Sequence, residues 1–157
     1  MNEETRNALS AMTTGLYIMT TGTVDEPYGM VVSWVSQVGY DPTLVMAAVR
    51  QNRFMHDLIP RYGCFGLNIL PQGIEDFLPF FKKAPSEEKF RDLELFAAVT
   101  GAPLIRQALA CLDCRLKETV QPGDHTLFLG IVEQGRVLRQ GDPLTSLDYD
   151  HVYLGRS

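Results

Sequence analysis

Alternating apolar and polar residues predict strands along most of the chain. From 108 to 116 every even position is apolar, while Asp113 and Arg115 between them are polar. This period of two is typical of a strand with one face in a core. Other segments rich in β-branched and aromatic residues have the same character, whereas 84–103 predicts no regular element. The sequence therefore predicts six strands, over 13–21, 28–38, 43–49, 64–70, 108–116 and 126–132.

Two segments follow a helical period instead. Residues 54–59 place their apolar positions on one side of a short helix, with Asn52 as its N-cap and Pro60 at its end. Residues 74–81 follow the i, i+3, i+4, i+7 stripe of a second helix, which Pro79 is expected to cut or kink. Six strands with two or three short helices favour a mainly β fold, a barrel carrying helices, over a βαβ sheet.

Composition narrows the possible functions. The 157 residues carry 14 Lys and Arg against 19 Asp and Glu, a net charge of −5, which disfavours binding to nucleic acid or to an anionic membrane. The polar, acidic start of the chain lacks the features of a signal peptide, and the longest apolar run, 44–49, is too short to span a membrane. We therefore expect one cytoplasmic globular domain over residues 1–157.

Several common catalytic motifs are missing from the sequence. It contains no G-x-G-x-x-G, no P-loop, no G-x-S-x-G elbow and no H-E-x-x-H. Cys111 and Cys114 form a C-x-x-C, which can indicate half a zinc site or a redox pair. In a strand, however, an interval of three sends the two side chains to opposite faces, so we expect no metal there.

The segment Gln51-Asn52-Arg53 is a candidate anion site. It lies where a buried strand gives way to a short helix, whose first amide hydrogens can hold an anion while Arg53 adds a full charge. Arg50 and Arg61 are close in sequence and make the region cationic. The alternative interpretation is that these residues are the solvated side of the helix.

Two further places have polar groups that suit a ligand. Ser33 to Gln37 is unusually polar for a strand, and small hydroxyls there allow a flat ligand to approach the backbone; the alternative is a half-exposed edge strand. His125 follows the turn at 122–124, where it could serve as a proton donor or as a hydrogen-bonding group beside a redox ligand. The alternative is an exposed loop histidine.

Taken in order, these signals resemble the flavin reductase-like family of FMN-binding split barrels. The resemblance covers nearly the whole chain, and Gly123-Asp124-His125 is its most telling part. The other matching segments are 13–15, 29–30, 33–36, 41–42, 44–45, 52–56, 65–68, 89–90, 101–104, 108–114 and 128–130.

The resemblance implies a six-stranded antiparallel split β-barrel that forms homodimers, with flavin near the subunit interface. Members of this family pass electrons from NADH or NADPH to FMN or FAD, and some hold FMN as electron carriers for a partner redox protein. In this chain the resemblance assigns His125 to the nicotinamide side. It assigns flavin contacts to Val31, Val32, Ser33, Trp34, Val35, Ser36, Gln51, Asn52, Arg53, Asn68, Lys89, Phe90, and Tyr149 or Tyr153.

The chain departs from the family pattern at three positions. Val31 stands where many relatives have Thr, so one hydroxyl near the ring is lost, and Met55 stands where many have Thr, which removes a phosphate partner. Ser is common at the position of Gly39. Three hypotheses follow: an NAD(P)H:flavin oxidoreductase, an FMN-holding electron carrier, and a barrel that has lost flavin and serves as a binding unit. The first is the leading one.

Overall fold

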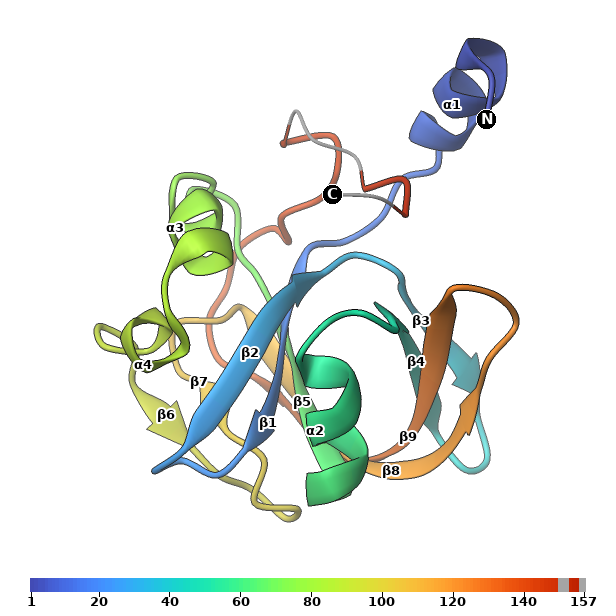
Figure 1. Ribbon diagram of the computed structural model, residues 1–157. Coiled ribbons are helices and arrows are strands. Elements are labelled where there is room, and N and C mark those ends of the chain that lie inside the picture. Colours follow the sequence, from blue (N-terminus) through green and yellow to red (C-terminus); the bar gives the residue numbers. More distant parts are fainter. Residues whose placement is uncertain (150–152, 156–157) are drawn as a thin grey trace.

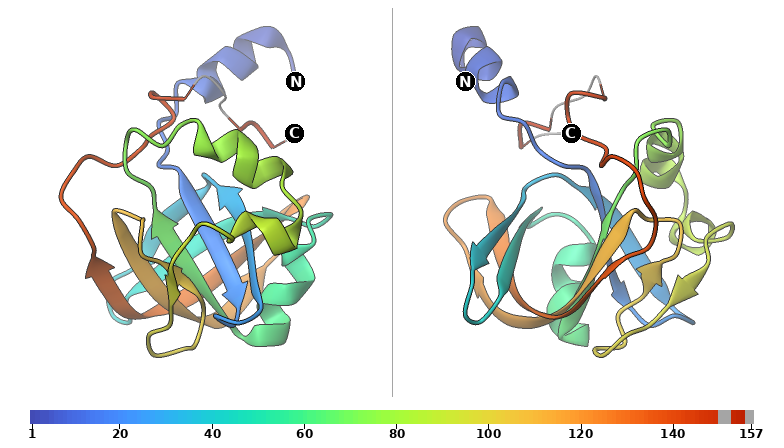
Figure 2. Two further views of the ribbon diagram at one scale, coloured as in Figure 1. Left: turned by 90° about the vertical axis from the view of Figure 1, so that its left-hand side faces the viewer. Right: turned by 180° about the vertical axis from the view of Figure 1, so that it is seen from behind.

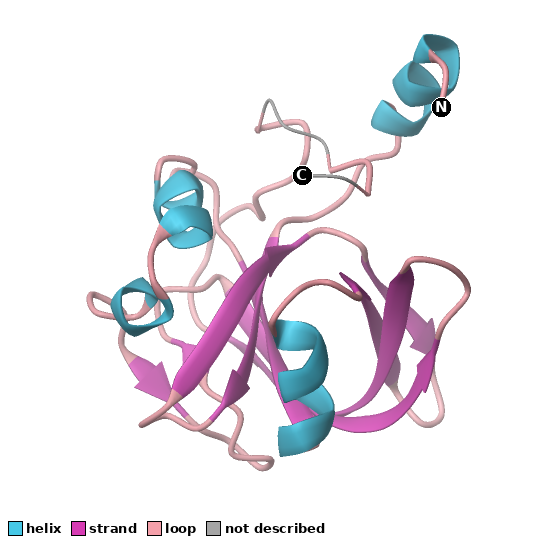
Figure 3. Ribbon diagram, viewed as in Figure 1, coloured by secondary structure: helices cyan, strands magenta, loops and turns pink. Residues whose placement is uncertain are grey.

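The fold is mainly β, built on one curled antiparallel sheet (Figures 1 and 3). A computed structural model describes residues 1–149 and 153–155. Its main sheet has seven strands in the order β2 (Pro27–Val32), β1 (Tyr17–Gly22), β5 (Cys64–Ile69), β8 (Ala110–Val120), β9 (His125–Val137), β4 (Leu44–Arg50) and β3 (Val35–Gly39). A second, two-stranded sheet pairs β6 (Leu95–Phe96) with β7 (Leu104–Ile105).

Four short helices accompany the strands. They are α1 (Glu3–Ser10), α2 (Met55–Tyr62), α3 (Phe77–Lys83) and α4 (Ser86–Lys89). Helix α2 lies in the opening between the β1–β2 side and the β4–β9 side of the sheet, and α1 projects away from the body (Figure 1). No helix in the described part of the chain is long and apolar enough to cross a membrane.

The predicted strand 28–38 is interrupted, and this raises the strand count from six to seven. Strands β2 and β3 are separated by Ser33 and Trp34 alone, yet they form the two opposite edges of the sheet. A flat sheet of seven strands would place its edges about 29 Å apart, whereas two linking residues reach about 10 Å. The sheet must therefore curl until its edges meet at this link, and Figure 2 shows the curl from two further sides.

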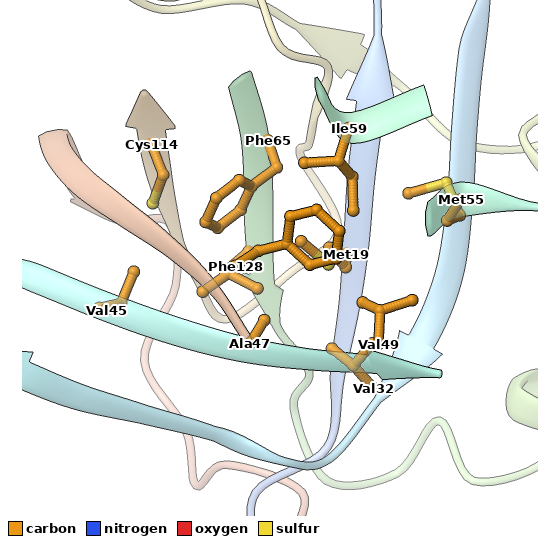
Figure 4. Packing of buried hydrophobic residues seen from close by; sticks show 11 residues of the cluster. Met19, Val32, Val45, Ala47, Val49, Met55, Ile59, Phe65, Cys114 and Phe128 are labelled. Atoms are coloured by element: carbon orange, nitrogen blue, oxygen red, sulfur yellow. The ribbon is translucent and has the colours of Figure 1, made fainter. Parts of the chain in front are cut away.

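The main core lies inside the curl. Phe65, Phe128 and Met19 point toward one another from three strands, and Met55 and Ile59 of α2 close the space above them (Figure 4). All five side chains are buried completely. Cys114 belongs to this core, while Cys111 packs against Phe96 and Leu104 in another, so the two cysteines lie on different faces, as predicted.

Both prolines in the predicted helices behave differently from expectation. Pro60 does not end α2 but lies inside it, and the helix stops at Gly63, whose φ of 69° is left-handed. Asn52 does not cap α2, because the helix begins later, after Phe54. Pro79 does not cut α3, since it occupies the first turn, where its missing N–H has no intrahelical partner to lose.

Several elements were not predicted. Helix α1 buries none of its residues, so it has no apolar stripe to reveal it. The stretch 84–103 contains α4 and β6, which are too short to show a period. Strands β8 and β9 extend beyond the predicted 108–116 and 126–132.

Asp113 is buried, although its place in the alternation predicted exposure. The register between β8 and β9 shifts between Asp113 and Cys114, where Glu133 of β9 is left without a partner in β8. The Asp113 carboxylate accepts hydrogen bonds from the amides of Val99 and Thr100, at 2.7 and 2.9 Å, and from the Thr100 hydroxyl. These charge-assisted bonds compensate the burial and fasten the irregular stretch to the sheet.

The close approach of β9 to Phe65 gives a test of the core. A Cβ added at Gly130 would lie 2.5 Å from Phe65 Cζ and 2.9 Å from Cys114 Cβ. Because both neighbours are buried, we expect Gly130→Ala to lower the free energy of unfolding by about 2 kcal/mol. Urea titration of the purified protein would measure the change.

Gly123→Ala is the matched control, because nothing lies within 4 Å of its added Cβ. We expect its unfolding midpoint to stay at the parent value. Equal stability of the two variants would contradict the described packing of Phe65.

Candidate functional site

A cavity of about 450 Å³ opens where β2 ends and the sheet edges meet. This volume is within the range of small-molecule and cofactor sites. The end of β2 and the link after it contribute Met30, Val31, Val32, Ser33 and Trp34. Other segments add Thr14, Leu16, Ala48, Phe54, Ser146 and Tyr153. The cavity is therefore built from stretches that lie far apart in the sequence.

Four cationic side chains complete the lining. Arg50 ends β4, Arg53 comes from the turn after it, Lys82 from α3 and Lys89 from the end of α4. Among the described residues, the lining contains no Asp or Glu. Since the whole chain carries a net charge of −5, this concentration of positive charge distinguishes the cavity from the rest of the protein. Such a site favours a ligand with an anionic group.

Lys89 is the most unusual of these cations, because it is 93% buried, with 7% of its surface exposed. Its Nζ donates to the Gly29 carbonyl at 3.3 Å and lies 5.1 Å from the ring centroid of Phe81 and 5.6 Å from that of Phe54. Burial, together with the nearby charge of Arg53, lowers the pKa of Lys89. A bound anion would supply the compensating charge.

The link between β2 and β3 forms part of the cavity wall. Ser33 and Trp34 belong to neither strand, so their amides lie outside the ladders of the sheet. The Trp34 carbonyl accepts a hydrogen bond from the Ala48 amide at 2.9 Å, which holds the link against β4. Val31, Val32, Ser33 and Trp34, four of the residues assigned to flavin contacts, thus line one wall together.

His125 lies beside the cavity and does not line it. Its Nδ1 is 2.7 Å from Asp124 Oδ1, its Nε2 is 2.8 Å from the Tyr153 hydroxyl, and its ring centroid is 4.7 Å from that of Trp34. The hydrogen bond with His125 is the main reason why the pKa of Asp124 is lowered. Burial raises the pKa of Tyr153. His125 is thus a buried, fully engaged side chain and not an exposed loop histidine.

The segment 51–53 divides between the cavity and its support. Arg53 lines the cavity, whereas Gln51 and Asn52 are exposed and do not. Gln51 joins the turn to the hairpin before β9, because its amide donates to the Asp124 carbonyl at 3.2 Å and its side chain to the Gly123 carbonyl at 3.1 Å.

Other predicted site residues lie away from the cavity. Asn68 is completely buried and bonds the Ile18 carbonyl and the Ile105 amide, so it joins β1 to β7. Phe90 packs edge-to-face on Phe81 in a core cluster. Val35 and Ser36 border a second hollow and do not line the cavity. Tyr149 does not line it either, and its ring centroid lies 4.9 Å from Lys82 Nζ.

The sequence candidates also omitted several lining residues. Arg50 was recognised only as a nearby charge, and Phe54 only as an apolar helix position. Lys82 and Ser146 carried no local signal, because each reaches the cavity only through the fold. Lys82 lies in the last turn of α3, and Ser146 belongs to the segment after β9, which runs back beside residue 14.

Comparison with known proteins gives consistent matches. A model of the family described as flavin reductase like domain matches residues 9–155. NADH-dependent flavin reductase StyB of Pseudomonas fluorescens is 33% identical over 152 residues, covering 96% of this chain and 88% of that protein. The structure of the NADH:FAD oxidoreductase SgcE6 of Streptomyces globisporus superposes with a TM-score of 0.81 at 28% identity, covering 90% of this chain and 86% of that one.

A third similarity is to a longer protein. A protein named as diflavin flavoprotein A 3, from a Synechocystis strain, is 32% identical over 142 residues. The match covers 87% of this chain and 24% of that protein, so the chain spans about a quarter of this relative's length.

Burial of Lys89 predicts that its charge destabilises the protein when no ligand is present. Because its pKa is lowered, the unfolded chain binds the proton more tightly, and the native state is penalised at pH values below that pKa. We expect Lys89→Met to raise the free energy of unfolding by about 1 kcal/mol at neutral pH. The difference should shrink as the pH rises from the lowered pKa of Lys89 toward the ordinary lysine pKa of 10.5, and vanish above it.

Lys83→Met provides the control, since Lys83 is exposed at the end of α3 and does not line the cavity. Denaturant titrations at neutral and high pH compare the two variants with the parent. A Lys89→Met variant that is less stable than the parent at neutral pH would refute this account of the site.

Proposed function

We propose that this chain, which belongs to the flavin reductase like domain family, is an NAD(P)H:flavin oxidoreductase. It would pass a hydride from NADH or NADPH to FMN. The observation that carries this proposal is the cationic cavity against the end of β2. Both the flavin nucleotide and the nicotinamide nucleotide are anionic through their phosphates, and both contain flat rings. The lining offers four cations for the phosphates and a wall of residues, mostly apolar, for the flat rings.

The residues present fit a flavin nucleotide. Arg53, with Arg50 and Lys89, would hold the phosphate through charge-assisted hydrogen bonds. The wall from Val31 to Trp34 would lie along the ring and offer it main-chain groups. A bound flavin supplies the ring that accepts the hydride, so the protein has chiefly to bind and orient the two nucleotides and to exclude water. FMN is the flavin we propose, with FAD as the alternative named for SgcE6.

The six-stranded barrel and the homodimer of the family are also part of this proposal. Counting the strand interrupted at Ser33 and Trp34 once gives six strands in the main sheet, which supports the six-stranded split barrel as part of this proposal. Val35 and Ser36 border an apolar hollow of about 280 Å³ with Tyr17, Leu112 and Val132, on the other side of the interruption. A second copy of the chain would bury this surface, and Val35 and Ser36 would then contribute to the site from a homodimer interface.

A second candidate is an FMN-holding electron carrier that exchanges electrons with a partner redox protein. The similarity to one quarter of a diflavin flavoprotein favours it, because there the matching region is part of a larger protein. The carrier would use the same cavity and hold its flavin permanently.

Purification followed by a visible spectrum and titration with FMN and FAD tests these functions. NADH or NADPH oxidation that depends on added free flavin supports the reductase. A tightly held flavin that is reduced only by a partner protein would favour the carrier. A colourless protein that takes up neither flavin would overturn both and leave a binding unit without flavin.

Arg53 gives a test of the phosphate assignment. We expect Arg53→Ala to weaken FMN binding by about tenfold to a hundredfold, because a charge-assisted hydrogen bond is lost. Quenching of flavin fluorescence measures the affinity. Arg139→Ala removes the same charge from an exposed position whose guanidinium contacts the Arg106 carbonyl. If both variants bind FMN like the parent, Arg53 does not hold the phosphate.

A further inference from the structure

His125 is enclosed on every polar side, so it has no atom left to offer a ligand. Asp124 occupies its Nδ1 and the Tyr153 hydroxyl its Nε2, and Trp34 covers the ring. The side chain retains 7% of its exposure. A direct contact between His125 and a nucleotide would require these bonds to break.

Tyr153 stands between His125 and the cavity. It lines the cavity, and its ring lies 5.1 Å from that of Trp34. Its hydroxyl bonds His125 and also receives a hydrogen bond from the side chain of Arg53. The hydroxyl therefore joins the candidate phosphate residue to the candidate nicotinamide residue.

The direction of these hydrogen bonds follows from Asp124. A carboxylate only accepts, so Nδ1 of the neutral ring carries the proton and Nε2 is an acceptor. The Tyr153 hydroxyl must then donate its one proton to Nε2. Of its two lone pairs, one accepts from Arg53, and the other can accept from an N–H group of a ligand in the cavity.

We propose that Tyr153 is the group that contacts the nicotinamide, accepting a hydrogen bond from its carboxamide N–H, and that His125 and Asp124 are positioning residues behind it. The inference rests on the proposed reductase function. Asp124 fixes the tautomer of His125, and His125 takes the tyrosine proton so that the phenolic oxygen faces the substrate as an acceptor. An N–H of the flavin ring is the other donor of this kind, and the experiment separates the two.

The test compares NADH with reduced acetylpyridine adenine dinucleotide, in which a methyl group replaces the carboxamide nitrogen. In Tyr153→Phe we expect kcat/KM for NADH to fall about tenfold, the value of one hydrogen bond. For the analogue, kcat/KM should stay within twofold, because that substrate never makes the bond. The affinity for FMN should also stay within twofold, which shows that the variant is folded.

Tyr40→Phe is the matched control, because Tyr40 is 89% exposed in the turn between β3 and β4. We expect it to keep the parent preference for NADH over the analogue. Three results would overturn the inference: equal losses with both substrates, a weakened FMN affinity with unchanged preference, or tighter binding of either nucleotide, which would make Tyr153 a plug.

A double-mutant cycle tests whether His125 acts through Tyr153. We expect His125→Ala to lower kcat/KM for NADH as Tyr153→Phe does, and the double variant to lose no more than either alone. Additive losses would place His125 in direct contact with substrate and overturn the positioning role.

Imidazole ¹⁵N shifts supply a readout that does not depend on activity. They should report the Nδ1–H tautomer in the parent and in Tyr153→Phe, and lose it in Asp124→Asn. An unchanged tautomer in Asp124→Asn contradicts the role of Asp124.

The outcomes also separate this inference from the proposed function. If the parent does not oxidise NADH with added flavin, the proposed function fails and this inference fails with it. If the parent does oxidise NADH and Tyr153→Phe keeps the parent preference, the inference alone fails.

Discussion

The link at Ser33 and Trp34 constrains both the sheet and the site. Two residues connect strands that lie at opposite edges of a seven-stranded order, so the sheet can only form curled. The hydrogen bond from the Ala48 amide to the Trp34 carbonyl ties the link to β4. The same interruption takes Ser33 and Trp34 out of the ladders, and both residues line the cavity. The feature that shapes the core therefore also supplies one wall for a ligand.

The charge of the cavity opposes the stability of the empty protein. Four cations face one space in an acidic chain, and Lys89 is almost completely buried there. Its contacts with the Gly29 carbonyl and with Phe54 and Phe81 offset part of the lost hydration, but none of these groups carries a negative charge. An anion bound in the cavity would attract the buried charge of Lys89 and offset the cost of burying it, so a ligand explains why a lysine lies there.

The local sequence pattern was sufficient to predict most of the strands and one wall of the site. Period and β-branched content predicted most strands, and the turn before His125 is where the sequence placed it. The interruption of 28–38 was not predictable, because Ser33 and Trp34 change which neighbour the strand pairs with, and pairing is a property of the fold. The burial of Asp113 was not predictable either, because its partners, Val99 and Thr100, lie in a stretch with no period.

The pairing of β4 with β9 fixes two parts of the proposed site relative to each other: the anion-binding turn and His125. Arg50 of β4 lies opposite His125 of β9 in the antiparallel register, so the sheet fixes the anion-binding turn relative to the histidine. Gln51 strengthens this connection through its two bonds to Asp124 and Gly123. Its contribution to the site is therefore geometric: it prevents the hairpin that carries His125 from moving independently of the turn that carries Arg53. A redox site that must align two flat rings depends on such rigidity, because small displacements of the partners reduce the rate steeply.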